Sequence, residues 1–76
     1  MKAFVLIKVE AGKTSKVLAG LRKQRNVREA FACFGPADVI AFVEAVNEQA
    51  LGQFMFKKIH SVQGVVGTDT HIVFEA

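Results

Sequence analysis

The chain has 76 residues, of which 51% are hydrophobic and 22% are charged, and its formal net charge is +3. This length predicts a single domain, residues 1–76, whose interior is too small to bury every apolar side chain. The one cysteine excludes an internal disulfide, no apolar run is long enough to span a membrane, and the scattered basic residues do not form a nucleic-acid arm. We therefore expect a cytoplasmic protein that has no signal peptide, does not enter a membrane and does not contact DNA directly. We also expect it to cover part of its apolar surface with a partner.

The first third of the chain predicts a strand followed by a helix. Residues 2–10 alternate with a period of two, which is typical of a strand. Gly12 ends this strand, and a helix should follow with Thr14 or Ser15 as its N-cap. The apolar residues of this helix recur at helical spacing: Val17, Leu18 and Leu21.

The rest of the chain predicts two strands, a second helix and a last strand. Strands over residues 27–34 and 37–45 are joined by a turn at Gly35 and Pro36. Asn47 is expected to cap the second helix, which should end near Gly64. Its apolar stripe comprises Leu51, Phe54, Met55, Ile59 and Val62. The last strand is expected from about residue 66 to Glu75.

The order βαββαβ predicts an α+β, ferredoxin-like fold, a four-stranded antiparallel sheet with both helices on one face. The helices can cover the face that carries Val5, Ile7 and Val39, but the other face is also apolar. A monomer rarely exposes such a patch, so we expect two sheets to pack face to face in a dimeric α+β barrel. The expected dimer interface consists of Phe4, Leu6, Ile40, Phe42, Ile72 and Phe74.

For several residues that could form a functional site, a purely structural role is the better explanation. The segment AGKTS lacks the first glycine of a phosphate-binding loop, because that position is Ile7. His60, His71, Cys33 and Asp38 do not show the close spacing of metal ligands, so we expect no metal and no cofactor. Asp38 follows the Gly-Pro turn, and two alternatives stay open for its carboxylate: a ligand contact, or a bond to nearby backbone N–H groups.

Two patterns, in residues 27–43 and 62–70, resemble one family. They are V27-x6-F34-G35-x2-D38-x4-V43 and, after the second helix, V62-x-G64-V65-V66-x-T68-x-T70. Over essentially the whole chain this order is similar to the ligand-binding (RAM) domain of the leucine-responsive regulatory protein/AsnC family. Full-length members carry an N-terminal helix-turn-helix, so the chain resembles a stand-alone effector domain without the DNA reader.

The resemblance implies dimers that assemble into rings, often octamers, with small effectors, usually amino acids, bound between dimers. The implied ligand-binding residues are Gly35, Ala37, Asp38, Thr68, Asp69 and Thr70. Backbone N–H groups of the turn can receive an α-carboxylate, and Asp38 can receive an α-ammonium group. Pro36 and Ala37 depart from the family, which often has a polar residue and then an aromatic there, and proline removes one backbone donor.

The leading hypothesis is therefore a non-enzymatic, homo-oligomeric module that binds an amino-acid effector and acts on full-length Lrp/AsnC regulators. The alternative is a small dimeric α+β barrel enzyme, such as a cofactor-free monooxygenase or an isomerase. His60 and His71 are the available acid-base residues for that alternative. A purely structural oligomer is the third reading.

Overall fold

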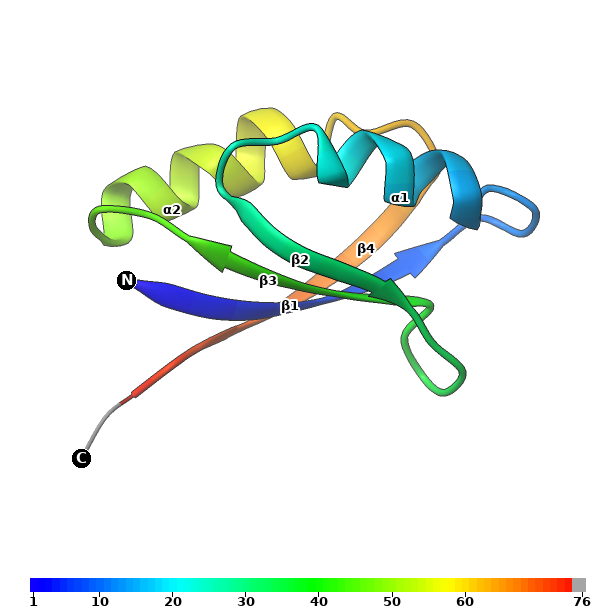
Figure 1. Ribbon diagram of the computed structural model, residues 1–76, viewed down its shortest axis with the longest axis horizontal. Coiled ribbons are helices and arrows are strands. Elements are labelled where there is room, and N and C mark those ends of the chain that lie inside the picture. Colours follow the sequence, from blue (N-terminus) through cyan, green and yellow to red (C-terminus); the bar gives the residue numbers. More distant parts are fainter. Residues whose placement is uncertain (75–76) are drawn as a thin grey trace.

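The computed structural model describes residues 1–74, which form four strands and two helices, the second continued by a π-helical segment (Figure 1). The predicted order βαββαβ is confirmed. In chain order the elements are β1 (Lys2–Val9), α1 (Thr14–Arg22), β2 (Val27–Ala32), β3 (Val39–Glu44), α2 (Glu48–Phe54), the π-helical segment η1 (Met55–Ile59) and β4 (Val65–Ile72).

The strands form one antiparallel sheet in the order β2-β3-β1-β4, and both helices lie on the same face of it (Figure 1). This arrangement confirms the predicted fold class. The two central strands, β3 and β1, are distant in sequence, so the centre of the sheet is formed by long-range pairing. The outer edges of β2 and β4 have no neighbouring strand among the described residues.

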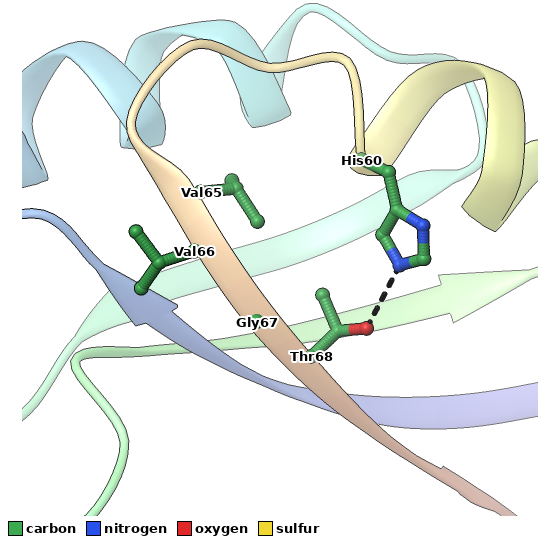
Figure 2. Close-up of a pocket in the computed structure, with 5 residues that line it drawn as sticks. All are labelled: His60, Val65, Val66, Gly67 and Thr68. Carbon is green, nitrogen blue, oxygen red and sulfur yellow. Dashed lines mark hydrogen bonds between the residues drawn. The ribbon is translucent and has the colours of Figure 1, made fainter.

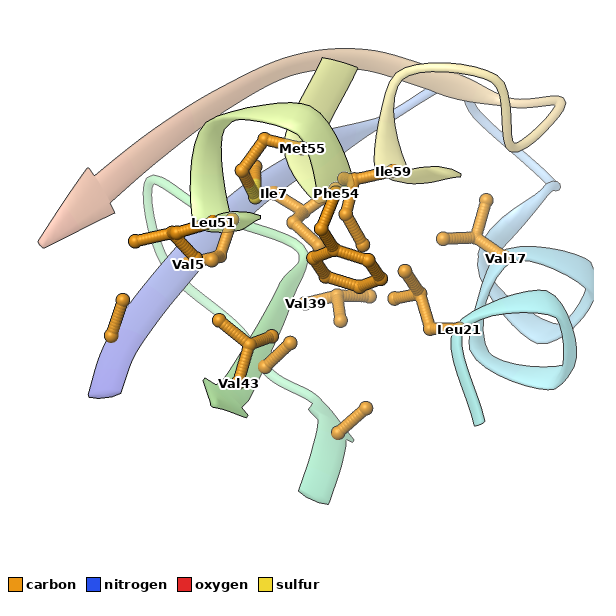
Figure 3. Close-up of a cluster of buried hydrophobic side chains, with 13 residues drawn as sticks. Val5, Ile7, Val17, Leu21, Val39, Val43, Leu51, Phe54, Met55 and Ile59 are labelled. Atoms are coloured by element: carbon orange, nitrogen blue, oxygen red, sulfur yellow. The ribbon is translucent and has the colours of Figure 1, made fainter. Parts of the chain in front are cut away.

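The helix-covered face holds the hydrophobic core, because every second residue of the central strands points toward the helices. Val5 lies opposite Ala41 and Ile7 opposite Val39, and all four side chains are fully buried. The second helix contributes its predicted apolar stripe, and Val17 and Leu21 contribute from α1 (Figure 3). Val62, at the end of the predicted stripe, packs against this core while remaining partly exposed.

The two helices begin differently. Asn47 caps α2 as predicted, since its side-chain oxygen accepts a 2.8 Å hydrogen bond from the Ala50 N–H. The prediction of Thr14 or Ser15 as N-cap of α1 is wrong. The cap position is Lys13, which makes no side-chain capping bond, and both predicted caps lie inside the helix.

The second helix ends earlier than predicted and in a different geometry. Its last turn is π-helical, with a 3.0 Å bond from the His60 N–H to the Met55 carbonyl, and it ends at Ile59. Gly64 does not close the helix, but it does take the left-handed backbone expected of it, with φ of 104°. A Cβ atom at Gly64 would lie 2.9 Å from the Lys13 Cβ, so glycine also allows β4 to start close beside α1.

The open face of the sheet carries the other set of strand residues. Phe4 pairs with Phe42 and Leu6 with Ile40, so these four predicted interface residues share this face. The phenyl rings of Phe4 and Phe42 pack with centroids 5.0 Å apart. Phe31, which is not among the predicted interface residues, lies opposite Ile40 and is 57% exposed.

The placement of Ile72 on this open face is wrong. Its register partner is Ala3, whose side chain points toward the helices, so Ile72 lies on the helix-covered side near its rim. The chain continues beside β1 to Val73, whose N–H donates to the Lys2 carbonyl, and Phe74 follows with its ring exposed. The predicted end of the strand at Glu75 lies outside the described residues.

The strands flanking the Gly-Pro turn are also shorter than predicted: β2 ends at Ala32 and β3 begins at Val39. The six residues between them form a loop that projects from the sheet (Figure 1).

Candidate functional site

The loop between β2 and β3 is fixed to the sheet by backbone hydrogen bonds at its base. The Cys33 N–H donates to the Asp38 carbonyl at 3.0 Å, and the Asp38 N–H donates to the Ile7 carbonyl at 2.9 Å. Gly35 forms the exposed tip with φ of 139°, a conformation that side-chain-bearing residues rarely adopt. The loop therefore holds a defined position against the end of β1.

The carboxylate of Asp38 bonds to the backbone, but not to its neighbours in the turn. Its Oδ2 accepts a 2.9 Å hydrogen bond from the Val9 N–H on β1. The pairing of β1 with β4 shifts register between Lys8 and Val9, because Lys8 lies opposite Gly67 and Val9 opposite Val65. Asp38 thus stabilises the irregular end of β1 and ties the loop to it.

A groove of about 310 Å³ lies where this loop meets β1 and β4. Its lining residues are Leu6, Lys8, Pro36, Ala37, Gly67, Thr68 and Asp69. The groove brings together three of the six predicted ligand-binding residues from two distant segments, namely Ala37 with Thr68 and Asp69. Gly35, Asp38 and Thr70 are not among its lining residues; Thr70 pairs with Val5 on the helix-covered side.

Opposite charges line this groove. Lys8 comes from β1, and Asp69 comes from β4, where it lies opposite Leu6. The Asp69 Oδ2 is 3.0 Å from the His71 Nε2, and both side chains are well exposed. Lys8 forms no ion pair within residues 1–74. The groove therefore offers an unpaired cation, a carboxylate and apolar surface from Leu6 and Pro36.

A second hollow, of about 420 Å³, lies beside the start of β4 toward the end of the second helix (Figure 2). His60, Val65, Val66, Gly67 and Thr68 line it, and the His60 Nε2 is 3.0 Å from the Thr68 Oγ1. Gly67 and Thr68 belong to both hollows. The early part of β4 is thus accessible from two sides, and no strand among residues 1–74 pairs with its outer edge.

The described residues provide no alternative centre of metal chemistry. Within residues 1–74, no three His, Cys, Asp or Glu side chains lie close enough to hold a metal ion together. Cys33 is partly buried, and its thiol donates to the Ala37 carbonyl at 3.4 Å. In the same part of the chain, none of the helices has the length and hydropathy to cross a membrane.

Sequence reasoning missed part of the groove. Leu6 was predicted in the dimer interface and Pro36 in the turn, and neither Lys8 nor Gly67 was predicted as a site residue. The alternation of β1 does place Leu6 and Lys8 on one face. The pairing of β1 with β4, which sets Lys8 opposite Gly67, follows from tertiary structure.

Comparisons of the chain with protein families and with known proteins all find relatives of one family. Residues 2–76 match the model of the Lrp/AsnC ligand binding domain. The HTH-type transcriptional regulator FL11 of Pyrococcus horikoshii is 37% identical over 75 residues, which are 99% of this chain and 49% of that protein. The chain thus spans about half the length of the curated relatives it matches.

Two solved structures have the same fold. FFRP-DM1 is 33% identical with a TM-score of 0.92, and the match covers 96% of this chain and 97% of that one. The transcriptional regulator NMB0573 of Neisseria meningitidis, solved as a complex with L-Met, is 22% identical with a TM-score of 0.89. That match covers 97% of this chain and 49% of the other, and at this identity it supports the fold alone.

Proposed function

Because the chain belongs to the Lrp/AsnC family of ligand-binding domains, we propose that it is an oligomeric regulatory module that binds an amino-acid effector in the groove between the β2–β3 loop and β4. One observation carries this proposal. The groove joins Ala37 to Thr68 and Asp69 and places Lys8 and Asp69, of opposite charge, on its walls. A free amino acid carries the complementary pair of charges.

The chemistry of the groove suits such a ligand. The Lys8 ammonium can receive the α-carboxylate, and Asp69 can receive the α-ammonium group. Leu6 and Pro36 can contact an apolar effector side chain. Asp38, whose Oδ2 already accepts the Val9 N–H, contributes by holding the loop and by placing negative charge beside the groove. Direct ligand contacts from Asp38, Gly35 and Thr70 belong to the same proposal, although none of the three lines the groove.

The proposal includes assembly, because the groove is open and shallow and a second copy can complete it. The apolar open face, with Phe4, Leu6, Ile40, Phe42 and Phe31, is the surface we assign to a sheet-to-sheet dimer. Dimers would then meet near the loop and the free edge of β4, giving a ring of dimers such as an octamer. The same surfaces would allow assembly with full-length Lrp/AsnC regulators.

Calorimetric titration tests the proposal, after a thermal-shift screen of the common amino acids that includes L-Met. We expect one amino acid to raise the melting temperature, and Lys8→Gln or Asp69→Asn to weaken its binding about 10-fold. Lys2→Gln is the matched control, since Lys2 is also an exposed lysine of β1 on the open face. Failure of every amino acid to bind, or equal losses for Lys2→Gln and Lys8→Gln, would contradict the proposal.

The relatives are transcriptional regulators, which supports a non-enzymatic role over the alternative of a small barrel enzyme. The two histidines that such an enzyme would use are separate: His60 contacts Thr68, and His71 contacts Asp69. Turnover of any small molecule that His60→Gln or His71→Gln abolishes would favour the enzyme instead. Oligomers that bind no effector would favour a purely structural role.

A further inference from the structure

Most basic residues of this chain lie in and around the helices, where acidic residues are few. Residues 11–28 and 49–68, which contain α1, most of α2, η1 and the first residues of β2 and β4, hold eight of the ten lysines and arginines and none of the aspartates or glutamates. The eight are Lys13, Lys16, Arg22, Lys23, Arg25, Arg28, Lys57 and Lys58. In sequence they are scattered, but the fold puts them on and around the helical layer.

Three of these lysines line one groove. The groove measures about 380 Å³ and lies between α1 and the segment that follows η1. Its lining residues are Lys16, Gly20, Lys23, Gln24, Lys58, Ser61, Val62 and Gln63. The walls meet at Gly20, where an added Cβ atom would lie 3.2 Å from the Val62 Cγ1. No carboxylate lines this groove, and within residues 1–74 none of its three lysines forms an ion pair.

Helix electrostatics explain only some of these lysines. Lys23 follows the last residue of α1 and Lys58 lies in the last turn of η1, where cations interact favourably with the negative end of a helix. Lys16 is in the first turn of α1, where a cation is unfavourable and no acidic residue offsets it. All three lysines share one feature, which is that their side chains line the same groove.

Two other basic side chains of the set are engaged elsewhere. The Arg22 Nη2 donates to the Ala30 carbonyl at 2.7 Å, and the Arg28 Nε is 3.0 Å from the Glu44 Oε1. Both contacts lie toward β2, away from the groove. Of the six remaining basic side chains, three line this groove, and Lys13, Arg25 and Lys57 lie outside it. A cluster of three charges is smaller than the long basic stripe that a nucleic-acid backbone requires.

We propose that this lysine groove, defined by Lys16, Lys23 and Lys58, binds a small anion that carries two or more phosphate groups. Lysine ammonium groups are point charges that suit phosphate oxygens, and three of them together attract a polyphosphate more strongly than a single phosphate. Gln24 and Gln63, which also line the groove, add neutral donors. The groove lies on the side of the helices, away from the open sheet face, so its ligand would not compete with sheet-to-sheet assembly.

Titration calorimetry with tripolyphosphate, at an ionic strength of about 50 mM, tests this proposal. We expect saturable binding that Lys58→Gln weakens about 2- to 5-fold and that Lys16→Gln/Lys23→Gln weakens further. Lys57→Gln is the matched control, because it removes the same charge from the adjacent residue of η1, which does not line the groove. Raising the salt to about 0.5 M should weaken binding by wild type strongly.

Three outcomes would overturn the proposal. The first is no saturable binding of tripolyphosphate by the folded wild-type protein. The second is an equal loss in Lys57→Gln and Lys58→Gln, which would indicate attraction by net charge alone. The third is much tighter binding of random-sequence duplex DNA at equal phosphate concentration, which would make the surface a nucleic-acid contact. None of these results depends on whether an amino acid binds beside Lys8.

Discussion

The two faces of the sheet are made by neighbouring residues of the same strands, yet they differ in what covers them. Val5 and Ile7 on β1 are fully buried beneath the helices, whereas Phe4, adjacent to Val5, is 47% exposed. Apolar character alone does not separate the faces, since the covered face carries alanine and branched residues and the open face carries Phe4, Ile40 and Phe42. The difference is that the helices supply apolar partners to one face only. An apolar face without such a partner indicates association with another chain. A charged substitution should therefore have different consequences on the two faces, unfolding on the covered face and dissociation on the open face.

The largest expected effect is that of a charge on the covered face. Ile7→Asp places a carboxylate among fully buried side chains, where no described group can pair with it, at a cost of several kcal/mol. A domain of this size has only about 5–15 kcal/mol of stability, so we expect the chain to lose its cooperative fold. Circular dichroism with a urea titration measures this, and a native-like transition midpoint would contradict the described core.

The same charge on the open face should have a different effect. Phe42→Asp introduces a carboxylate at a partly exposed position, which water can reach in the monomer. If two sheets pack together, this charge would enter a desolvated interface at a cost of several kcal/mol and dissociate the dimer. Sedimentation or light scattering should then report folded monomers for Phe42→Asp and dimers or larger assemblies for wild type.

Phe31→Asp sharpens this result, because Phe31 reports whether the interface extends to the edge strand β2. A wild-type chain that remains a stable monomer at micromolar concentration would remove the basis for any sheet-to-sheet dimer.

Substitution of Asp38 is expected to have a smaller effect. Part of it should come from the lost hydrogen bond and part from the lost charge. Asp38→Ala removes the acceptor of the Val9 N–H and should lower the free energy of unfolding by about 1–3 kcal/mol. If the carboxylate also binds an effector, affinity should fall about 10- to 100-fold while the sheet face stays intact.

Asp38→Asn is the matched variant for this test. Its amide oxygen can still accept the Val9 N–H, whereas its charge is gone. Wild-type affinity in Asp38→Asn would assign the residue to structure alone, and a loss in both variants would assign it to the ligand as well. Calorimetric titration with the best amino acid from the screen distinguishes these cases.

The smallest effects are expected in the covering helices themselves. Asn47→Ala removes the side-chain bond to the Ala50 N–H and should cost about 1 kcal/mol. Thr14→Ala should change stability by less than about 0.5 kcal/mol, because Thr14 makes no capping bond. Thermal or urea unfolding measures both variants, and a larger loss for Thr14→Ala would reverse the assignment of caps.

The candidate site was predictable only in its outline. The two segments that meet, around residues 35–38 and 68–70, were expected from resemblance to the family, and Ala37, Thr68 and Asp69 do share a groove. The walls from Leu6 and Lys8 were not predicted as part of it. A groove between two segments depends on the strand that lies between them, and nothing local in residues 33–38 specifies that neighbour.

The sequence by itself determined the elements and their order, and it divided the residues of each strand into two faces. Strand alternation and the apolar stripe of the second helix are local patterns, and local patterns fix which residues can be buried together. The same alternation specifies the sides of a strand but not its partners.

Tertiary structure decided what depends on contacts between distant segments. The register of β4 against β1 moved Ile72 to the helix side, because a side chain takes the face of the residue it pairs with. The 2.9 Å bond from Val9 gave Asp38 a partner outside its own turn. Packing of α1 beside the end of the second helix turned lysines at positions 16, 23 and 58 from scattered charges into one groove. Each of these features depends on contacts between residues far apart in the chain, which a local pattern does not encode.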